Sequence, residues 1–274
     1  MSTYGGLGVL VSEGSIVKFR ARLALIAMLA FVASLAWTQT DLNSTREAAE
    51  SGVAEAQFWL AVRYLVRNDV PQNNAEAMRW LRTAADQGFA AAQITIGTMY
   101  NNAWGVPEDK AKAIYWFRIA AEAGEAAAQS SLAGIYHNGE GVSQDHVEAA
   151  YWYGLAAEQG DVIAQRSLAF MYRNGEGVAQ NDVEAVNWFR LAAEQGEATA
   201  QSLLGAMHAT GEGVLKDSVL AHMWYNISGA NGIELARSLR GNLESNMTPD
   251  QVARATELAR ACMASDYRDW DLQA

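Results

Sequence analysis

The stretch Ala126–Gly160, AAAQSSLAGIYHNGEGVSQDHVEAAYWYGLAAEQG, is the clearest copy of a unit that recurs along the chain every 36 residues. Its glutamine, tyrosine, tryptophan and closing glycine all return at this interval. The counterparts are Gln57, Gln93, Gln165 and Gln201 for Gln129; Tyr64, Tyr100 and Tyr172 for Tyr136, with His208 in the last copy; Trp80, Trp116, Trp188 and Trp224 for Trp152; and Gly52, Gly88, Gly124, Gly196 and Gly232 for Gly160. A fixed period of this length is typical of a solenoid, in which each unit packs on its neighbours.

Each unit is predicted to form two helices joined by a glycine turn. The apolar residues of the segment 126–137 recur at helical spacing, and Gly139 follows where a left-handed residue ends a helix. The second helix is expected to begin near Asp145, which can cap its first turn, with Glu148 at the reciprocal position of a capping box. Alanines let the helices approach closely, so we expect the repeated tryptophans and tyrosines to fill the core between them.

Three motifs in each copy resemble the SEL-one-like repeat family, whose units are slightly longer relatives of the tetratricopeptide repeat. The motifs are A-x-A-Q-x-x-L-x-x-x-Y, then G-x-G-V, then A-x-x-W-[YF]-x-x-A-A-x-x-G, in five copies over residues 53–232. The first copy departs from them with Arg67–Pro71 in place of the glycine-rich turn, and the last with His208 and Ser228-Gly229. The resemblance implies an all-α fold: a right-handed α-solenoid of five 36-residue helix-turn-helix repeats with N- and C-terminal capping helices.

The chain is expected to contain four segments. These are an upstream segment and signal peptide (1–36), an N-terminal capping half-repeat (37–52), the five repeats (53–232), and a degenerate repeat with a C-terminal capping helix (233–274). In the last segment Arg237 stands where the repeats have glutamine. Thr248, Pro249 and Gln251 are typical of a helix start, which predicts a closing helix over 249–263.

The N-terminal segment predicts export to the periplasm or outside the cell. Lys18, Arg20 and Arg22 precede an apolar run that is short for a membrane span, as in a Sec-type signal peptide over about 17–36 with cleavage after Ala36. An uncleaved N-terminal anchor is the alternative. We further hypothesise that translation starts near Val17, because a basic stretch there would make an ordinary signal start.

The charge of the chain argues against two classes of partner. The formal net charge is −11, and cleavage after Ala36 would make it −13 by removing Lys18, Arg20, Arg22 and Glu13. An acidic chain is a poor nucleic-acid binder, and the same sign disfavours an anionic membrane surface after signal cleavage. Cys262 is the only cysteine, so no internal disulfide can form, and we expect this thiol to be buried.

The sequence gives no catalytic set, metal site or cofactor motif that we would assign, so we expect no enzyme activity. Ser15 and Lys18 match the S-x-x-K of penicillin-recognising enzymes, but they lie before the expected signal peptide. The four histidines, His137, His146, His208 and His222, show none of the H-x-x-x-H or H-E-x-x-H spacings of metal sites. His208 and His222 could approach each other across one repeat, but no cysteine or paired acids converge on them.

The resemblance implies that the first helices line a concave binding face. Eight non-motif residues, which we call the first-helix strip, are the candidate partner-binding residues: Phe58, Thr98, Asn101, Ser130, His137, Arg166, Phe170 and Arg173. Arginine and aromatic residues are common binding anchors, so we expect Arg166 and Arg173 to contact an acidic segment of a partner. The alternative is that these arginines only keep a helix face soluble.

We therefore expect an exported, monomeric, non-catalytic scaffold that binds an unidentified protein or peptide through its concave face. The alternative is an envelope protein that binds or hydrolyses cell-wall peptides or β-lactams, as the resemblance suggests for some relatives. A nucleophile with a base on the inner face would favour that alternative, and the sequence shows none.

Overall fold

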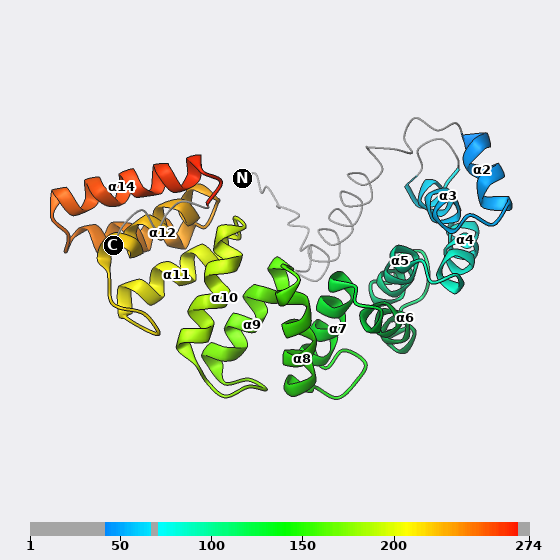
Figure 1. The fold of residues 1–274 in the computed structure, drawn as a ribbon, viewed down its shortest axis with the longest axis horizontal. Coiled ribbons are helices and arrows are strands. Elements are labelled where there is room, and N and C mark those ends of the chain that lie inside the picture. Colours follow the sequence, from blue (N-terminus) through cyan, green and yellow to red (C-terminus); the bar gives the residue numbers. More distant parts are fainter. Residues whose placement is uncertain (1–41, 67–70, 268–274) are drawn as a thin grey trace, which may run out of the picture. The chain divides into compact units, whose positions relative to one another are not determined.

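The structure is a computed structural model that describes residues 42–66 and 71–267 (Figure 1). Within these residues the chain forms thirteen helices and no strand. The helices are α2 (Leu42–Glu50), α3 (Ala54–Val66), α4 (Asn74–Asp86), α5 (Ala90–Asn101), α6 (Lys110–Glu122), α7 (Ala126–Asn138), α8 (His146–Glu158), α9 (Val162–Asn174), α10 (Asp182–Glu194), α11 (Ala198–Thr210), α12 (Ser218–Ala230), α13 (Glu234–Glu244) and α14 (Pro249–Ala264). The expected signal peptide, its cleavage site, Ser15, Lys18 and most of the first copy's altered turn lie outside the described residues.

The chain divides into two compact units within α6. Unit 1 comprises residues 1–116, and unit 2 comprises residues 117–274. In unit 1, α2 packs on α3, α3 on α4, and α4 on α5. The helix α2 lies inside the expected N-terminal half-repeat and covers the first full repeat through the buried Thr45 and Ala49. No helix among the described residues has the length and apolar character that crossing a bilayer requires.

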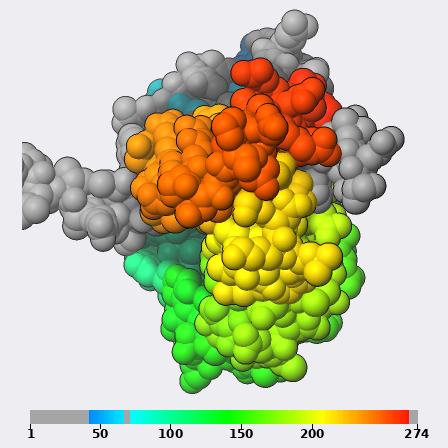
Figure 2. All heavy atoms as spheres, turned by 90° about the vertical axis from the view of Figure 1, so that its left-hand side faces the viewer, coloured from blue at the N-terminus to red at the C-terminus, as the bar shows by residue number. Residues whose placement is uncertain are grey.

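Unit 2 contains three helical hairpins followed by the C-terminal cap. The hairpins are α7–α8, α9–α10 and α11–α12, and the second helix of each of the first two also packs on the next hairpin. The last of these helices, α12, contacts both α13 and α14. Figure 2 shows the orange and red atoms of α13 and α14 gathered on the yellow atoms of the last hairpin. The chain is therefore an α-solenoid with capping helices, as predicted.

The helix ends confirm the predicted turn chemistry, with one correction. Gly139 adopts the left-handed conformation at the end of α7, and the Asp145 side chain accepts hydrogen bonds from the backbone N–H groups of Val147 and Glu148. The Glu148 carboxylate does not reach back to the cap residue but accepts the indole N–H of Trp152 at 2.9 Å. The full capping box occurs instead in α14, where Thr248 and Gln251 satisfy each other's backbone N–H groups. The closing helix thus begins where the sequence placed it.

A buried glutamine joins each repeat to the one before it. Each of the five glutamines donates from Nε2 to a backbone carbonyl at the end of the preceding second helix, at 3.1 to 3.2 Å. The acceptors are the carbonyl oxygens of Ala49, Ala85, Ala121, Ala157 and Ala193. Arg237 keeps this contact in the degenerate repeat, because its Nε donates to the carbonyl of Gly229 at 3.0 Å. The motif glutamine therefore links each repeat to the helix that precedes it.

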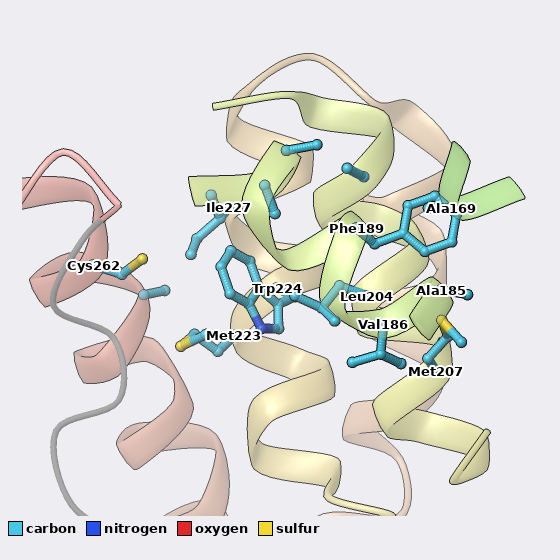
Figure 3. Close-up of a cluster of buried hydrophobic side chains, with 14 residues drawn as sticks. Ala169, Ala185, Val186, Phe189, Leu204, Met207, Met223, Trp224, Ile227 and Cys262 are labelled. Carbon is cyan, nitrogen blue, oxygen red and sulfur yellow. The ribbon is translucent and has the colours of Figure 1, made fainter. Parts of the chain in front are cut away.

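A cluster of buried hydrophobic side chains lies at the C-terminal end of unit 2 (Figure 3). Trp224 and Phe189 are fully buried there and pack with Leu204 and Met207. Cys262 of α14 joins the same cluster and is fully buried, as predicted. The tryptophan positions are not equivalent: Trp80, Trp152 and Trp224 are buried, whereas Trp116 and Trp188 are half-buried. The half-buried Trp188 still packs against the core cluster of unit 2, so the tryptophan positions differ in the depth of their burial.

The start of the C-terminal tail packs back on the solenoid. The hydroxyl of Tyr267 lies 3.1 Å from Nδ2 of Asn231, and its ring lies against Gly196. Burial raises the pKa of the Cys262 thiol to about 11, with a further contribution from the negative charge of Glu194. Residues beyond 267, including Trp270, lie outside the described part of the chain.

Candidate functional site

The helix α9 presents two arginines from the first-helix strip, and both form ion pairs with the next repeat. Arg166 Nη1 lies 3.0 Å from Oε1 of Glu197, and Arg173 Nη2 lies 3.1 Å from Oε2 of Glu212. Both arginine side chains remain one-third exposed. A guanidinium carries five N–H donors, so a single ion pair leaves donors for a second acceptor. These arginines therefore link repeats and still present hydrogen-bond donors at the surface.

The other strip residues of unit 2 differ in their exposure. Phe170 is half-buried between the two arginines in sequence, and its ring meets Phe189 edge-on at 5.2 Å. Ser130 is buried, with 8% of its surface exposed. His137 is half-buried at the end of α7. In this unit the first-helix strip therefore combines charged, polar and aromatic side chains, and most of its exposed surface comes from α9.

In unit 1 the strip residues contact aromatic, backbone and ammonium groups of the same unit. Phe58 is 3% exposed and packs against Trp59 and Phe89, with ring centroids 5.0 and 5.3 Å away. The hydroxyl of Thr98 donates to the carbonyl of Ile94 at 2.8 Å. The side chain and the carbonyl of Asn101 both accept hydrogen bonds from the ammonium group of Lys110, each at 3.0 Å.

Unit 1 also contains an open groove of about 580 Å³ between α4 and the turn that follows α5. Arg79, Arg82 and Asp86 supply charge on its α4 side, and Tyr100 and Pro107 lie on the other. Arg82 donates to the Tyr100 hydroxyl at 2.9 Å, and Arg79 pairs with Glu76. Both arginines of the groove therefore already bond to side chains of the same chain.

The structure brings together three residues that sequence reasoning did not combine. His137 at the end of α7, His146 at the start of α8 and Glu176 in the turn after α9 each place one potential ligand atom within 4.8 Å of the others. The two histidines match neither of the short metal-binding spacings, H-x-x-x-H and H-E-x-x-H. The 36-residue period could have indicated this cluster. Each repeat's turn lies against the preceding repeat, so a residue of the turn meets residues that are distant in sequence.

The remaining two histidines have separate environments. The Nε2 atom of His222 lies 2.7 Å from the Glu244 carboxylate, and its side chain is almost fully buried. His208 is also buried, and this desolvation lowers the pKa of its imidazole. A neutral imidazole fits its position in place of the tyrosine that the other copies carry.

The chain is similar to solved repeat proteins of bacteria. A protective antigen of uropathogenic Escherichia coli that displays an SLR fold is 34% identical, with a TM-score of 0.75 over 82% of this chain and 49% of the antigen. The chain thus spans about half of that protein's length. A Sel1 repeat protein from Oxalobacter formigenes is 28% identical, with a TM-score of 0.65 over 81% of this chain and all of the other. No curated protein sequence matches the chain.

The family model for the Sel1 repeat matches five consecutive segments: residues 54–89, 90–125, 126–161, 162–197 and 198–233. The first segment begins at residue 54 and the last ends at 233, each one residue after the bounds 53–232 read from the sequence. Proteins of this family generally act as non-catalytic scaffolds that bind protein partners. The matches cover more than half of the chain, and the chain therefore belongs to the Sel1 repeat family.

Proposed function

We propose that this chain is an exported scaffold that binds an acidic protein or peptide segment along the α9 face of unit 2. The observation that carries the proposal is the pair of one-third-exposed guanidinium groups of Arg166 and Arg173, with the half-buried Phe170 between them in sequence. A partner carboxylate would bond to the N–H groups that the Glu197 and Glu212 pairs leave free. The apolar ring would supply the desolvated part of the contact.

The internal ion pairs make this surface preorganised. Each arginine is already held in place by a glutamate of the following repeat, so a partner loses less side-chain entropy on binding than it would with a freely mobile arginine. The same pairs limit the gain in affinity, because the glutamates partly neutralise the guanidinium charge. We therefore expect moderate, salt-sensitive binding that discriminates by geometry as well as by charge.

Export rests on the N-terminal sequence pattern alone. The basic residues before the apolar run, and the small residues at the expected cleavage site, support a periplasmic or secreted location. N-terminal sequencing of the protein from a cell envelope fraction tests this: a mature N-terminus at Trp37 supports cleavage after Ala36, and an intact apolar run in the recovered protein contradicts it.

A capture experiment with three forms of the protein tests the binding face. The parent chain, Arg166→Ala/Arg173→Ala, and Arg254→Ala/Arg260→Ala are each incubated with a native envelope fraction. The last variant removes two exposed arginines from α14 and matches the charge change away from the strip. Captured partners are then purified, and their dissociation constants are measured at two salt concentrations.

We expect the strip variant to bind an identified partner at least about tenfold more weakly, since each charge-assisted hydrogen bond contributes more than 1 kcal/mol. The α14 variant should bind like the parent. Equal binding by the strip variant contradicts the proposed face. If the parent captures no protein but muropeptides or a β-lactam raise its melting temperature, the cell-wall alternative replaces the scaffold.

A further inference from the structure

A cluster of two imidazoles and a carboxylate joins the third and fourth repeats. One ring nitrogen each of His137 and His146 and one carboxylate oxygen of Glu176 lie within 4.8 Å of one another. The imidazole rings meet edge-on with centroids 5.1 Å apart, and all three residues are half-buried. Imidazole and carboxylate groups together are a common ligand set for transition-metal ions.

The backbone fixes the position of the carboxylate. Gly175 and Gly177 both have positive φ values, 70° and 69°, and they place Glu176 in a tight turn. A Cβ atom at Gly177 would lie 2.0 Å from the carbonyl oxygen of His146, so this turn rests directly on the start of α8. Asn174 Nδ2 donates to Glu176 Oε1 at 3.0 Å, the kind of hydrogen bond that commonly orients a ligating carboxylate.

The corresponding place one repeat later holds an arginine–glutamate ion pair. The residues 36 positions further on are Arg173, Asp182 and Glu212, and Gly213 rests on the Asp182 carbonyl as Gly177 rests on that of His146. There the cation of Arg173 pairs with Glu212 at 3.1 Å. In the earlier copy the turn glutamate is kept, but histidine replaces the arginine.

The histidine cluster also contains unsatisfied buried atoms. The Nδ1 atoms of both His137 and His146 are shielded from solvent and have no hydrogen-bond partner, a feature that His208 and His222 share outside the cluster. Buried polar atoms in proteins are almost always paired, and an exception calls for an explanation such as an ion. A metal ion at the cluster would supply a positive charge beside both of these imidazoles.

We propose that His137, His146 and Glu176 bind a divalent transition-metal ion, with Zn²⁺ the best match to two imidazoles and one carboxylate. Ligands at 2.0 to 2.2 Å from a tetrahedral zinc lie about 3.4 Å apart, so the 4.8 Å spread closes with small side-chain rotations. Three protein ligands leave a fourth position for water or a partner's side chain. The ion links the third repeat to the fourth, as the Arg173–Glu212 ion pair links the fourth to the fifth.

The two helix dipoles and the carboxylate at the cluster together favour a bound cation. His137 lies in the last turn of α7, where the helix dipole attracts positive charge, whereas His146 lies at the start of α8, where the dipole opposes it. The Glu176 carboxylate adds a full negative charge to the cluster. The site does not depend on the proposed partner, and its test needs none.

Calorimetric titration of the full, untagged chain with Zn²⁺ tests the proposal, with Co²⁺ absorption as a report on the ligand geometry. We expect one saturable site per chain, a Co²⁺ spectrum typical of four-coordinate nitrogen and oxygen ligands, and a higher melting temperature that a chelator reverses. Absence of saturable binding overturns the proposal.

Two variants and a control locate the ion. Glu176→Gln removes one ligand, and His137→Arg removes another while recreating the Arg–Glu pair of the next repeat, so that the fold is retained. Each should weaken Zn²⁺ binding more than about tenfold and reduce the rise in melting temperature at a fixed Zn²⁺ concentration. Glu212→Gln removes the equivalent carboxylate one repeat later and should bind Zn²⁺ like the parent. Unchanged binding by either ligand variant, or equal weakening by the control, overturns the assignment.

Discussion

Replacing the buried glutamine of the fourth repeat tests whether this side chain holds adjacent repeats together. Gln165 is 4% exposed, and its Nε2 donates to the Ala157 carbonyl at 3.2 Å. Its Oε1 accepts a hydrogen bond from Gln195 at 2.8 Å. Gln165→Ala removes both bonds, and each contributes about 1 kcal/mol net. The Ala157 carbonyl keeps the backbone N–H of Gly160, so it is not left fully unpaired.

We therefore expect Gln165→Ala to lower the free energy of unfolding by about 2–3 kcal/mol, the upper part coming from lost packing of the side-chain methylenes. Gln165→Glu keeps the shape but places a carboxylate against the Ala157 carbonyl, so it should destabilise at least as much at neutral pH. Gln180→Ala, an exposed position in the same repeat, should change the free energy by less than about 0.5 kcal/mol.

The assay is urea unfolding followed by far-ultraviolet circular dichroism, fitted with a nearest-neighbour model because solenoids need not unfold in one step. Hydrogen exchange of the backbone N–H groups near the start of α9 locates the change. The reasoning is refuted if Gln165→Ala destabilises no more than Gln180→Ala, or if faster exchange is spread evenly over all repeats.

Three further outcomes follow from burial and backbone geometry. Gly177→Ala should destabilise by clearly more than the roughly 1 kcal/mol of left-handed strain expected for Gly232→Ala, because only the first places a Cβ against the His146 carbonyl; equal melting temperatures would contradict this. Trp224→Ala should cost about 3–5 kcal/mol in urea unfolding, since the indole is fully buried; a loss below 1 kcal/mol would be inconsistent with this core. Cys262 should react with a thiol reagent at pH 8 only after unfolding. Because its pKa is higher in the folded than in the unfolded chain, its stabilising contribution is complete below pH 9 and lost as the pH rises towards 11; stability independent of pH over that range would exclude this linkage.

The fold could be predicted because its determinants are local and repeated. A helix-ending glycine such as Gly139 and a capping aspartate such as Asp145 act within one turn. The capping position recurs as aspartate or asparagine in all five copies, and the glycine recurs in three of them. Even the substitution of arginine at position 237 preserved the contact with the preceding helix, because a guanidinium can donate to the same carbonyl as an amide. The role of the motif glutamine was not predicted, since it bonds to a backbone atom that has no sequence signature.

The candidate site could be predicted only in part. The position of Arg166 and Arg173 on a first helix followed from the period, but their pairing with Glu197 and Glu212 depends on where the next repeat's turn lies. The burial of Phe58 follows from aromatic neighbours in three dimensions, Trp59 and Phe89, which a strip defined by spacing alone does not include. Periodicity therefore predicts which residues share a face of the solenoid. Packing between repeats decides which of those residues stay exposed to a binding partner.

The side chains at the contact between a turn and the preceding repeat differ from copy to copy, while the buried core is kept. Transplanting the histidine cluster to the next copy tests whether the backbone geometry of this contact is enough to form the site. Arg173, Asp182 and Glu212 occupy the places of His137, His146 and Glu176 on a backbone with the same glycine contact. Arg173→His/Asp182→His should therefore create a second Zn²⁺ site, and titration should rise from one ion per chain to two. The variant loses the Arg173–Glu212 pair, which at one-third exposure contributes only about 0.5 kcal/mol, so it should still fold. A folded variant that still binds one ion would show that similar backbone geometry is insufficient for this site.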